Sequence, residues 1–155
     1  MTRDSPEQCA DTLPRFRVSL VRDNRAAAPD RAIWTSPEAA RILMPYFAGL
    51  DREHFIVVGL DSKHHIIGLN TVAIGSLTMA IVHPREVFKP LILMNAAGFL
   101  CAHSHPSGDC TPSVEDRTLT ARLRQAADLI GITMLDHLIL ADRHYSFADN
   151  GWPGA

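Results

Sequence analysis

The sequence has 155 residues, of which 46% are hydrophobic and 21% charged, as expected for one soluble domain with an ordinary core. The formal net charge of -2 gives no electrostatic case for nucleic acid or an anionic membrane as a partner. No apolar run reaches membrane-spanning length and the first residues show no signal-peptide pattern, so we expect a cytoplasmic protein. Three cysteines without a Cys-x-x-Cys pair argue against disulfides and against a cysteine zinc cluster.

The first third of the chain predicts a tail, a strand and a helix. Residues 1–14 lack periodicity and predict a flexible N-terminal tail, which leaves 15–155 as the domain. The segment Phe16–Val21 alternates apolar and polar residues and predicts a first strand. A helix should begin near Ser36 as its cap, with a proline and an acid in its first turn. Its expected buried face comprises Ala39, Ile42, Leu43 and Tyr46.

The middle of the chain predicts a hairpin and a second helix. Residues 53–60 are rich in β-branched side chains, and residues 65–74 should return as the partner strand after a turn. The sheet should continue over residues 75–82 after a bend at Gly75. A helix should open at His83 and end near Asn95. Because Pro90 lies inside that helix, we expect a kink or a break there.

The last third predicts two strands around a long helix, followed by a short strand. Residues 99–103 form an apolar run, and residues 113–130 repeat apolar side chains at helical spacing up to the cap residue Gly131. Residues 133–140 and 145–147 then predict the last strands. Strands that alternate with helices and hairpins favour a mixed α/β fold over an all-parallel sheet.

His103 and His105 lie at the end of the apolar run, two residues apart. In an extended chain their side chains point the same way, and the Asp116 carboxylate could join them from the start of the following helix. Two imidazoles, one carboxylate and an open position make a plausible catalytic zinc site. A His-x-His pair is commonly structural, and Ser113-x-x-Asp116 is close to a helix capping box. The two interpretations are compatible, because a cap would also hold Asp116 in place.

The full pattern is His103-Ser-His105-Pro, a six-residue gap and Ser113-x-x-Asp116. It resembles the JAMM (MPN+) motif of the JAB1/MPN metallopeptidases, and it is most similar to their bacterial RadC-like JAB branch. The segments that carry the narrower resemblance are 82–87, 95–97, 105–108, 112–113, 135–137 and 145–147. Over about Phe16–Trp152 the resemblance implies a cytidine-deaminase-like mixed sheet flanked by about three helices.

The resemblance also implies roles for individual residues. A zinc ion would be held by His103, His105 and Asp116, with water at the fourth position. The motif serine of the family stabilises the oxyanion, a role that falls to Ser113, although a plain helix cap is the competing interpretation.

A general base must also be found among the five glutamates of the chain. Glu53 and Glu86 remain as candidates for the base. The other three glutamates lie in the tail, at an exposed helix start, or beside Asp116 on a diverging face of the helix. The family's catalytic glutamate stands just before a buried strand, and Glu53 occupies that position. We therefore predict Glu53 as the base, with Glu86 as the runner-up.

Other polar residues rank lower as functional candidates. His83 begins a helix and could line a cleft, and Cys110 lies in the loop of the metal motif, where it could be oxidised. Cys101 is expected to be a core residue. Asp136 and His137 could support the sheet as a hydrogen-bonded pair, or His137 could lie behind the metal ligands.

The functional hypothesis is a zinc-dependent peptidase or isopeptidase that hydrolyses an amide bond in a peptide or a ubiquitin-like protein. The alternatives are a DNA-repair-associated accessory protein, a metal-dependent hydrolase acting on nucleic acid, and a non-catalytic MPN scaffold. The net charge of -2 argues against the nucleic-acid alternatives. A zinc nucleobase deaminase is disfavoured, because the sequence lacks the His-x-Glu and Pro-Cys-x-x-Cys signatures of that class.

Overall fold

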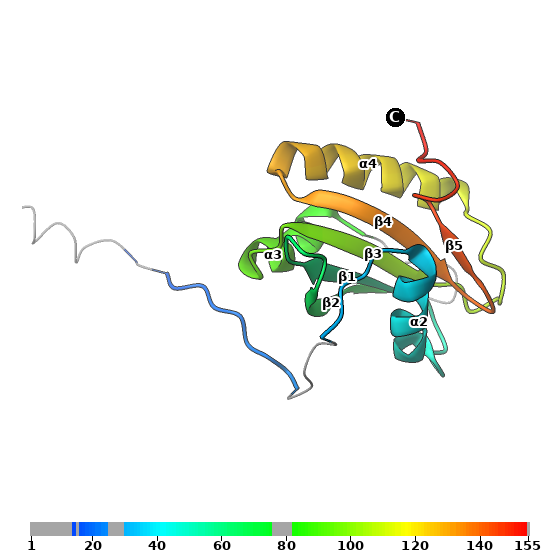
Figure 1. The fold of residues 1–155 in the computed structure, drawn as a ribbon, viewed down its shortest axis with the longest axis horizontal. Helices are drawn as coiled ribbons and strands as arrows, with labels where there is room; N and C mark the ends of the chain where they lie inside the picture. Colours follow the sequence, from blue (N-terminus) through cyan, green and yellow to red (C-terminus); the bar gives the residue numbers. More distant parts are fainter. Residues whose placement is uncertain (1–13, 15, 25–29, 76–81, 155) are drawn as a thin grey trace, which may run out of the picture.

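A computed structural model of the chain describes residues 14, 16–24, 30–75 and 82–154 (Figure 1). The elements in chain order are α2 (Ser36–Phe47), β1 (His54–Leu60), β2 (Ile66–Ile74), α3 (Pro84–Leu93), β3 (Gly98–Ser104), α4 (Val114–Ile130), β4 (Thr133–Leu140) and β5 (His144–Ser146). No helix within these described ranges has both the length and the apolar composition of a membrane span.

The five strands form one mixed sheet in the order β2-β1-β3-β4-β5. β1 runs antiparallel to both β2 and β3, and β4 runs antiparallel to β5. β3 and β4 are parallel, and α4 is the crossover that a parallel pair requires. The mixed α/β fold predicted from the alternation of strands and helices is confirmed.

Each face of the sheet is covered by helices. Alternate residues of the central strands, such as Val57 and Cys101, pack with Leu91 of α3 and Leu123 of α4. The other face of the same strands packs against α2. Figure 1 shows α4 and α2 on opposite sides of the sheet. β3 is therefore buried along its whole length, and the packed core holds in place the strand end that carries the histidines.

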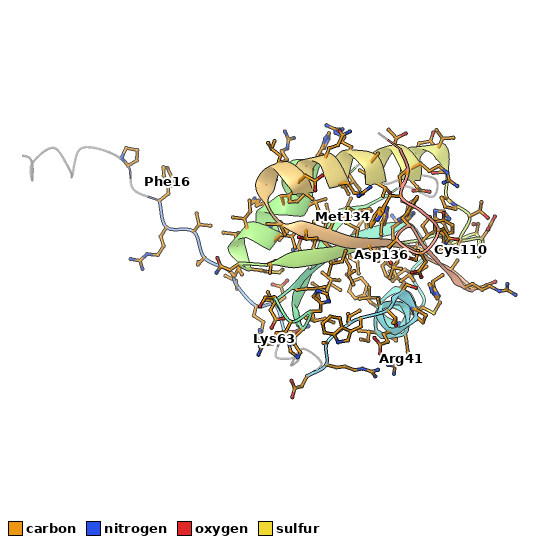
Figure 2. All side chains as sticks on the ribbon, turned by 45° about the horizontal axis from the view of Figure 1, so that its top comes forward. Phe16, Arg41, Lys63, Cys110, Met134 and Asp136 are labelled. Carbon is orange, nitrogen blue, oxygen red and sulfur yellow. The ribbon has the colours of Figure 1, made fainter. Side chains whose placement is uncertain are left out.

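The strand predicted at Phe16–Val21 is wrong. Residues 16–22 form no strand, and Phe16 and Val21 are 89% and 81% exposed. Figure 2 shows Phe16 on a segment that extends away from the sheet and helices. Alternation is a local pattern, whereas a strand also needs a neighbouring strand and a core face to cover. The predicted continuation of the sheet after Gly75 falls largely on residues 76–81, which lie outside the described residues.

The first described helix differs in its cap and its buried face. The N-cap is Thr35, whose hydroxyl accepts a hydrogen bond from the Glu38 backbone N–H, and Ser36 is the first helical residue. Tyr46 is 40% exposed, and Phe47 is buried in its place. The buried face therefore follows the four-residue spacing of Ala39, Leu43 and Phe47.

The second helix is not broken at its internal proline. α3 continues through Pro90 as far as Leu93, two residues short of the expected end. Asn95 follows with φ 54°, a left-handed conformation that asparagine tolerates better than most residues. The chain therefore leaves the helix at Asn95, and Pro90 is accommodated inside the helix, where its side chain is buried.

Candidate metal centre

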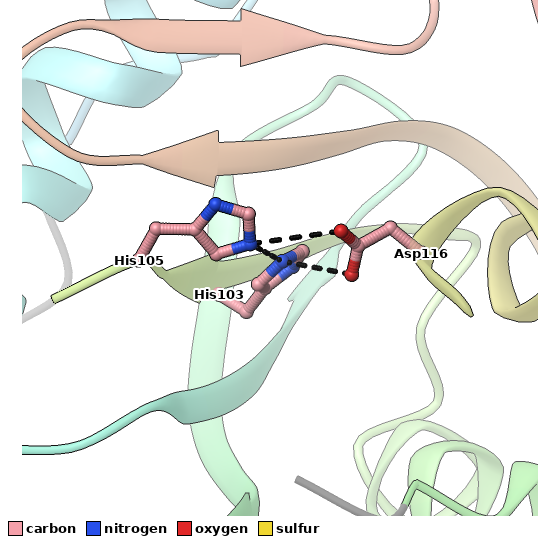
Figure 3. Close-up of side chains that lie close together, drawn as sticks. All are labelled: His103, His105 and Asp116. Atoms are coloured by element: carbon pink, nitrogen blue, oxygen red, sulfur yellow. Dashed lines mark hydrogen bonds and ion pairs between the residues drawn. The ribbon is translucent and has the colours of Figure 1, made fainter. Parts of the chain in front are cut away.

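Three side chains meet at the end of β3. His103 is the last histidine of the strand, His105 follows the strand, and Asp116 comes from the first turn of α4 (Figure 3). His103 Nε2 lies 3.1 Å from Asp116 Oδ1 and 3.1 Å from His105 Nε2. His105 Nε2 lies 3.6 Å from Asp116 Oδ2. These residues form a cluster that could hold a metal ion.

The sheet and the helix cap hold two of these side chains. His103 lies opposite Phe55 in the pairing of β3 with β1, and the two rings stack with centroids 5.9 Å apart. Asp116 is part of a complete capping box at the start of α4. The backbone N–H and the hydroxyl of Ser113 both donate to Asp116 Oδ2, at 2.8 and 2.6 Å. The Asp116 N–H in turn donates to the Ser113 hydroxyl at 3.0 Å.

The loop after β3 orients His105. The ring Nδ1 lies 2.7 Å from the Asp109 carbonyl oxygen, which can only accept, so His105 carries a proton on Nδ1. In the neutral imidazole Nε2 is then unprotonated and faces Asp116. Gly108 allows the tight loop with φ 85°, and a side chain there would meet the Asp142 carboxylate at 3.2 Å.

The electrostatics of the cluster favour a cation. Burial alone would raise the pKa of Asp116, but the contacts of its carboxylate with the His103 and His105 rings hold that pKa far below its usual range. The hydrogen bond with Asp116 raises the pKa of His105, and the negative charge of Glu53 raises it further. A carboxylate that stays ionised next to imidazole lone pairs attracts either a proton or a metal ion.

The donor set matches a four-coordinate metal. Zinc bonds of about 2.0–2.1 Å in a tetrahedron separate neighbouring ligand atoms by about 3.3 Å. The three observed separations of 3.1, 3.1 and 3.6 Å bracket that value. Three ligands leave the fourth position open, which is the arrangement of catalytic rather than structural sites. Two nitrogens and one oxygen are compatible with several transition metals, so the donor set alone does not select zinc.

A buried histidine lies directly behind the cluster. His137 of β4 is fully buried, and its Nε2 is 2.8 Å from His103 Nδ1. Its other ring nitrogen, Nδ1, is 2.6 Å from the Thr120 hydroxyl. Burial holds the pKa of His137 well below its usual range. The structure bears out both interpretations of His137, because its ring contacts a cluster histidine and its backbone N–H donates to Asp136 Oδ1 at 2.7 Å.

Thr120 was missed by sequence reasoning, although a signal existed. It follows Asp116 by four residues on a helix, so the two share one face. The Asp136 carboxylate accepts a hydrogen bond from the backbone N–H of its neighbour His137 at 2.7 Å. It accepts hydrogen bonds from the Ser146 hydroxyl at 2.7 Å and the Ala148 N–H at 3.0 Å.

Glu53 lies next to the cluster and Glu86 has other surroundings. Phe55 lies opposite His103 where the pairing of β1 with β3 ends, and Glu53 comes just before β1 as His105 comes just after β3. The charge of Glu53 also contributes to the raised pKa of His105, after the larger effect of Asp116. Glu86 is exposed in the first turn of α3 and pairs with Arg85 at 3.5 Å.

The remaining candidates lie outside the cluster. Cys101 is fully buried, and burial raises the pKa of its thiol well above the usual range. Cys110 is half-buried in the loop, and both cysteines are free thiols. His83 is the exposed N-cap of α3 and makes no side-chain capping bond.

A cavity of about 520 Å³ opens on the other face of the sheet, beside α2. Leu100, which lines it, belongs to the core on the α2 side, whereas Phe55, against which His103 stacks, belongs to the opposite core. The cavity is therefore separate from the candidate metal centre.

Comparison with known proteins places the chain in a family. The family model for the RadC-like JAB domain matches residues 33–152. The chain is 43% identical over 136 residues to a UPF0758 protein of Rubrobacter xylanophilus, covering 87% of this chain and 58% of that protein. It is 44% identical over 133 residues to the UPF0758 protein YsxA of Bacillus subtilis, covering 84% and 58%. The chain thus spans less than two thirds of these relatives. On these matches and the fold, the chain belongs to the family of RadC-like JAB domains.

Proposed function

We propose that this domain is a zinc-dependent peptidase or isopeptidase that hydrolyses an amide bond in a peptide or a ubiquitin-like protein. The observation that carries the proposal is the convergence of His103 Nε2, His105 Nε2 and the Asp116 carboxylate, with the charge of Glu53 also acting on His105. Three ligand atoms with an open fourth position are typical of hydrolytic zinc enzymes.

Each residue of the site has a distinct part in this proposal. Zinc, when bound, would lower the pKa of a water molecule and polarise the scissile carbonyl. Glu53 would accept a proton from the water on its carboxylate and deliver it to the leaving amine. Ser113 would stabilise the oxyanion only after its hydroxyl turns away from Asp116 Oδ2, to which it donates in this structure.

Two alternatives predict different results from the same protein. A hydrolase acting on nucleic acid would use the same metal ligands, although the net charge of -2 supplies little attraction for phosphates. A non-catalytic MPN scaffold would keep the fold and need no base at Glu53. Assays on peptide, ubiquitin-like fusion and DNA substrates therefore belong in one experiment.

The test is a Glu53→Gln variant, with Glu86→Gln as its matched control. We expect Glu53→Gln to retain the metal content of wild type and to lose amide hydrolysis by about 100-fold or more, because the amide cannot accept the proton. Glu86→Gln should retain full turnover, because Glu86 is exposed and paired with Arg85. Metal content and turnover are measured on the same samples.

Three outcomes would contradict the proposal. Full turnover by Glu53→Gln would show that Glu53 is not the base. Cleavage of DNA without cleavage of any peptide or ubiquitin-like substrate would favour the nucleic-acid alternative. Zinc-loaded wild type that cleaves none of these substrates would favour the scaffold.

A further inference from the structure

We propose that Thr120 and His137 are positioning residues that fix the His103 ring in one tautomer. In that tautomer Nδ1 carries the proton, and Nε2 is left unprotonated where it faces Asp116 and His105. The hydrogen bonds behind the cluster determine this arrangement, because each has only one consistent direction.

The chain of hydrogen bonds starts at a carbonyl group. The Thr120 hydroxyl lies 2.6 Å from the backbone oxygen of Asp116, which has no proton to give. The single hydroxyl proton of Thr120 is therefore donated to that oxygen. Thr120 Oγ1 lies equally close, at 2.6 Å, to His137 Nδ1, and there it must accept. His137 consequently carries a proton on Nδ1.

The next link depends on His137 being neutral. Its ring is fully buried between the rings of Phe55 and Phe147, with centroids 5.4 and 5.2 Å away. An imidazolium in such an aromatic pocket would lose its hydration, so the neutral ring is the stable form. A neutral imidazole has one N–H, and in His137 that proton is on Nδ1. His137 Nε2 is then an acceptor.

The last link reaches the candidate metal centre. His103 Nδ1 lies 2.8 Å from His137 Nε2, and since the latter accepts, His103 Nδ1 donates. In the neutral His103 ring the lone pair is consequently on Nε2, 3.1 Å from Asp116 Oδ1. The opposite arrangement would require Thr120 to donate to His137 and would leave two oxygen lone pairs facing each other 2.6 Å apart.

This chain of hydrogen bonds joins three elements and ends where a metal would bind. Thr120 is on α4, His137 is on β4 and His103 is on β3. The helix must therefore be packed correctly against the sheet before the lone pair of His103 is fixed on Nε2. A ligand histidine that donates its other N–H binds metal more strongly, because no proton has to be displaced. The tautomer of His103 does not depend on the proposed function, and only the expected effect on zinc affinity rests on it.

The experiment combines tautomer detection in the metal-free protein with zinc titration. Long-range ¹H–¹⁵N NMR spectra at about pH 8, above the ordinary histidine pKa, distinguish protonated from unprotonated ring nitrogens. In wild type we expect His103 to be protonated on Nδ1 and bare on Nε2. Thr120→Val keeps the shape of the side chain and removes the acceptor for His137. It should move the His103 proton to Nε2 and weaken zinc binding by about tenfold or more.

The matched control is Thr118→Val on the same helix. Thr118 is exposed, and its hydroxyl also donates to a backbone oxygen four residues earlier, that of Val114, at 2.9 Å. This variant should change neither the tautomer nor the zinc affinity. A wild-type His103 protonated on Nε2 would overturn the proposal, as would a Thr120→Val protein with unchanged tautomer and affinity. The tautomer measurement needs no metal, so it stands or falls separately from the proposed zinc chemistry.

Discussion

At the scale of single residues, His105 is more open to solvent than the other histidine of the candidate metal centre. It is half-buried, whereas His103 is 1% exposed. The hydrogen bond to Asp116, followed by smaller effects of the Asp109 carbonyl and of Glu53, raises its pKa. Protons therefore bind Nε2 of His105 more readily than they bind an ordinary histidine, and they compete there with a metal ion.

Proton competition gives the site a defined pH dependence. The pKa of His105 is raised above the ordinary histidine value of about 6.5. As the pH falls, protons therefore begin to compete with a metal ion for His105 before the pH reaches about 6.5. Below the His105 pKa we expect zinc affinity to decrease by about tenfold per pH unit, since one proton must leave for each metal bound. Titration with a competing chelator between about pH 8 and pH 6 measures this slope. Affinity that stays constant over that interval would contradict the assigned role of His105.

The three residues of the candidate metal centre could be predicted from the sequence, and the residues behind them only partly. His103 and His105 were predicted from their spacing, and Asp116 from its place at a helix start. His137 had two equal interpretations, because sequence does not tell which strand lies beside which. Thr120 was missed, because a threonine on a helix face is ordinarily a packing residue. Contacts between β3, β4 and α4 are tertiary, and only the structure supplies them.

At the scale of elements, α4 is both a structural crossover and one wall of the site. Its capping box closes the N-terminus of the helix, and the same hydrogen bonds hold the Asp116 carboxylate toward the histidines. The negative Asp116 is also favourable near the positive end of the helix dipole. Stability of the helix start and geometry of the site are thus coupled through Ser113.

A Ser113→Ala variant tests this coupling, with Thr35→Ala at the cap of α2 as its control. Each substitution removes one side-chain cap, so each should lower the free energy of unfolding by about 1 kcal/mol. Only Ser113→Ala should also weaken zinc binding, by about tenfold, because it removes one of the two hydrogen bonds that residue 113 donates to Asp116 Oδ2. Equal zinc affinities in the two variants would show that the cap does not position Asp116. Denaturant unfolding and chelator competition provide the two readouts.

Element boundaries were predictable where local chemistry decides them. Ser113 and Gly131 mark the two ends of α4 as the sequence indicated, and Gly131 has the left-handed φ of 80° typical of a C-cap. Pro90 was expected to kink or break α3, but packing carries the helix through it; Pro90 and Leu91 are both buried. Local rules give way where burial of a neighbouring side chain stabilises the helix more than one lost hydrogen bond costs.

At the scale of the whole molecule, the central sheet separates the candidate metal centre from a cavity on its other face. The candidate metal centre lies on the face shared with α4, and the cavity lined by Trp34 and Asp149 lies on the α2 face. The alternation at Phe16–Val21 resembled a strand of this sheet, yet the described part of that segment pairs with none of the five strands. Alternation of apolar and polar residues shows that a segment could form a strand, but it forms one only where a neighbouring strand of the folded sheet is available to pair with it.

The central claim is that His103, His105 and Asp116 form a zinc site, and metal analysis of protein purified without an affinity tag tests it most directly. Wild type should contain or take up about one zinc ion per chain. A variant with His103→Ala and His105→Ala should bind none at the same free zinc concentration, while circular dichroism shows that it is folded. Equal zinc content in a folded variant and in wild type would contradict the claim.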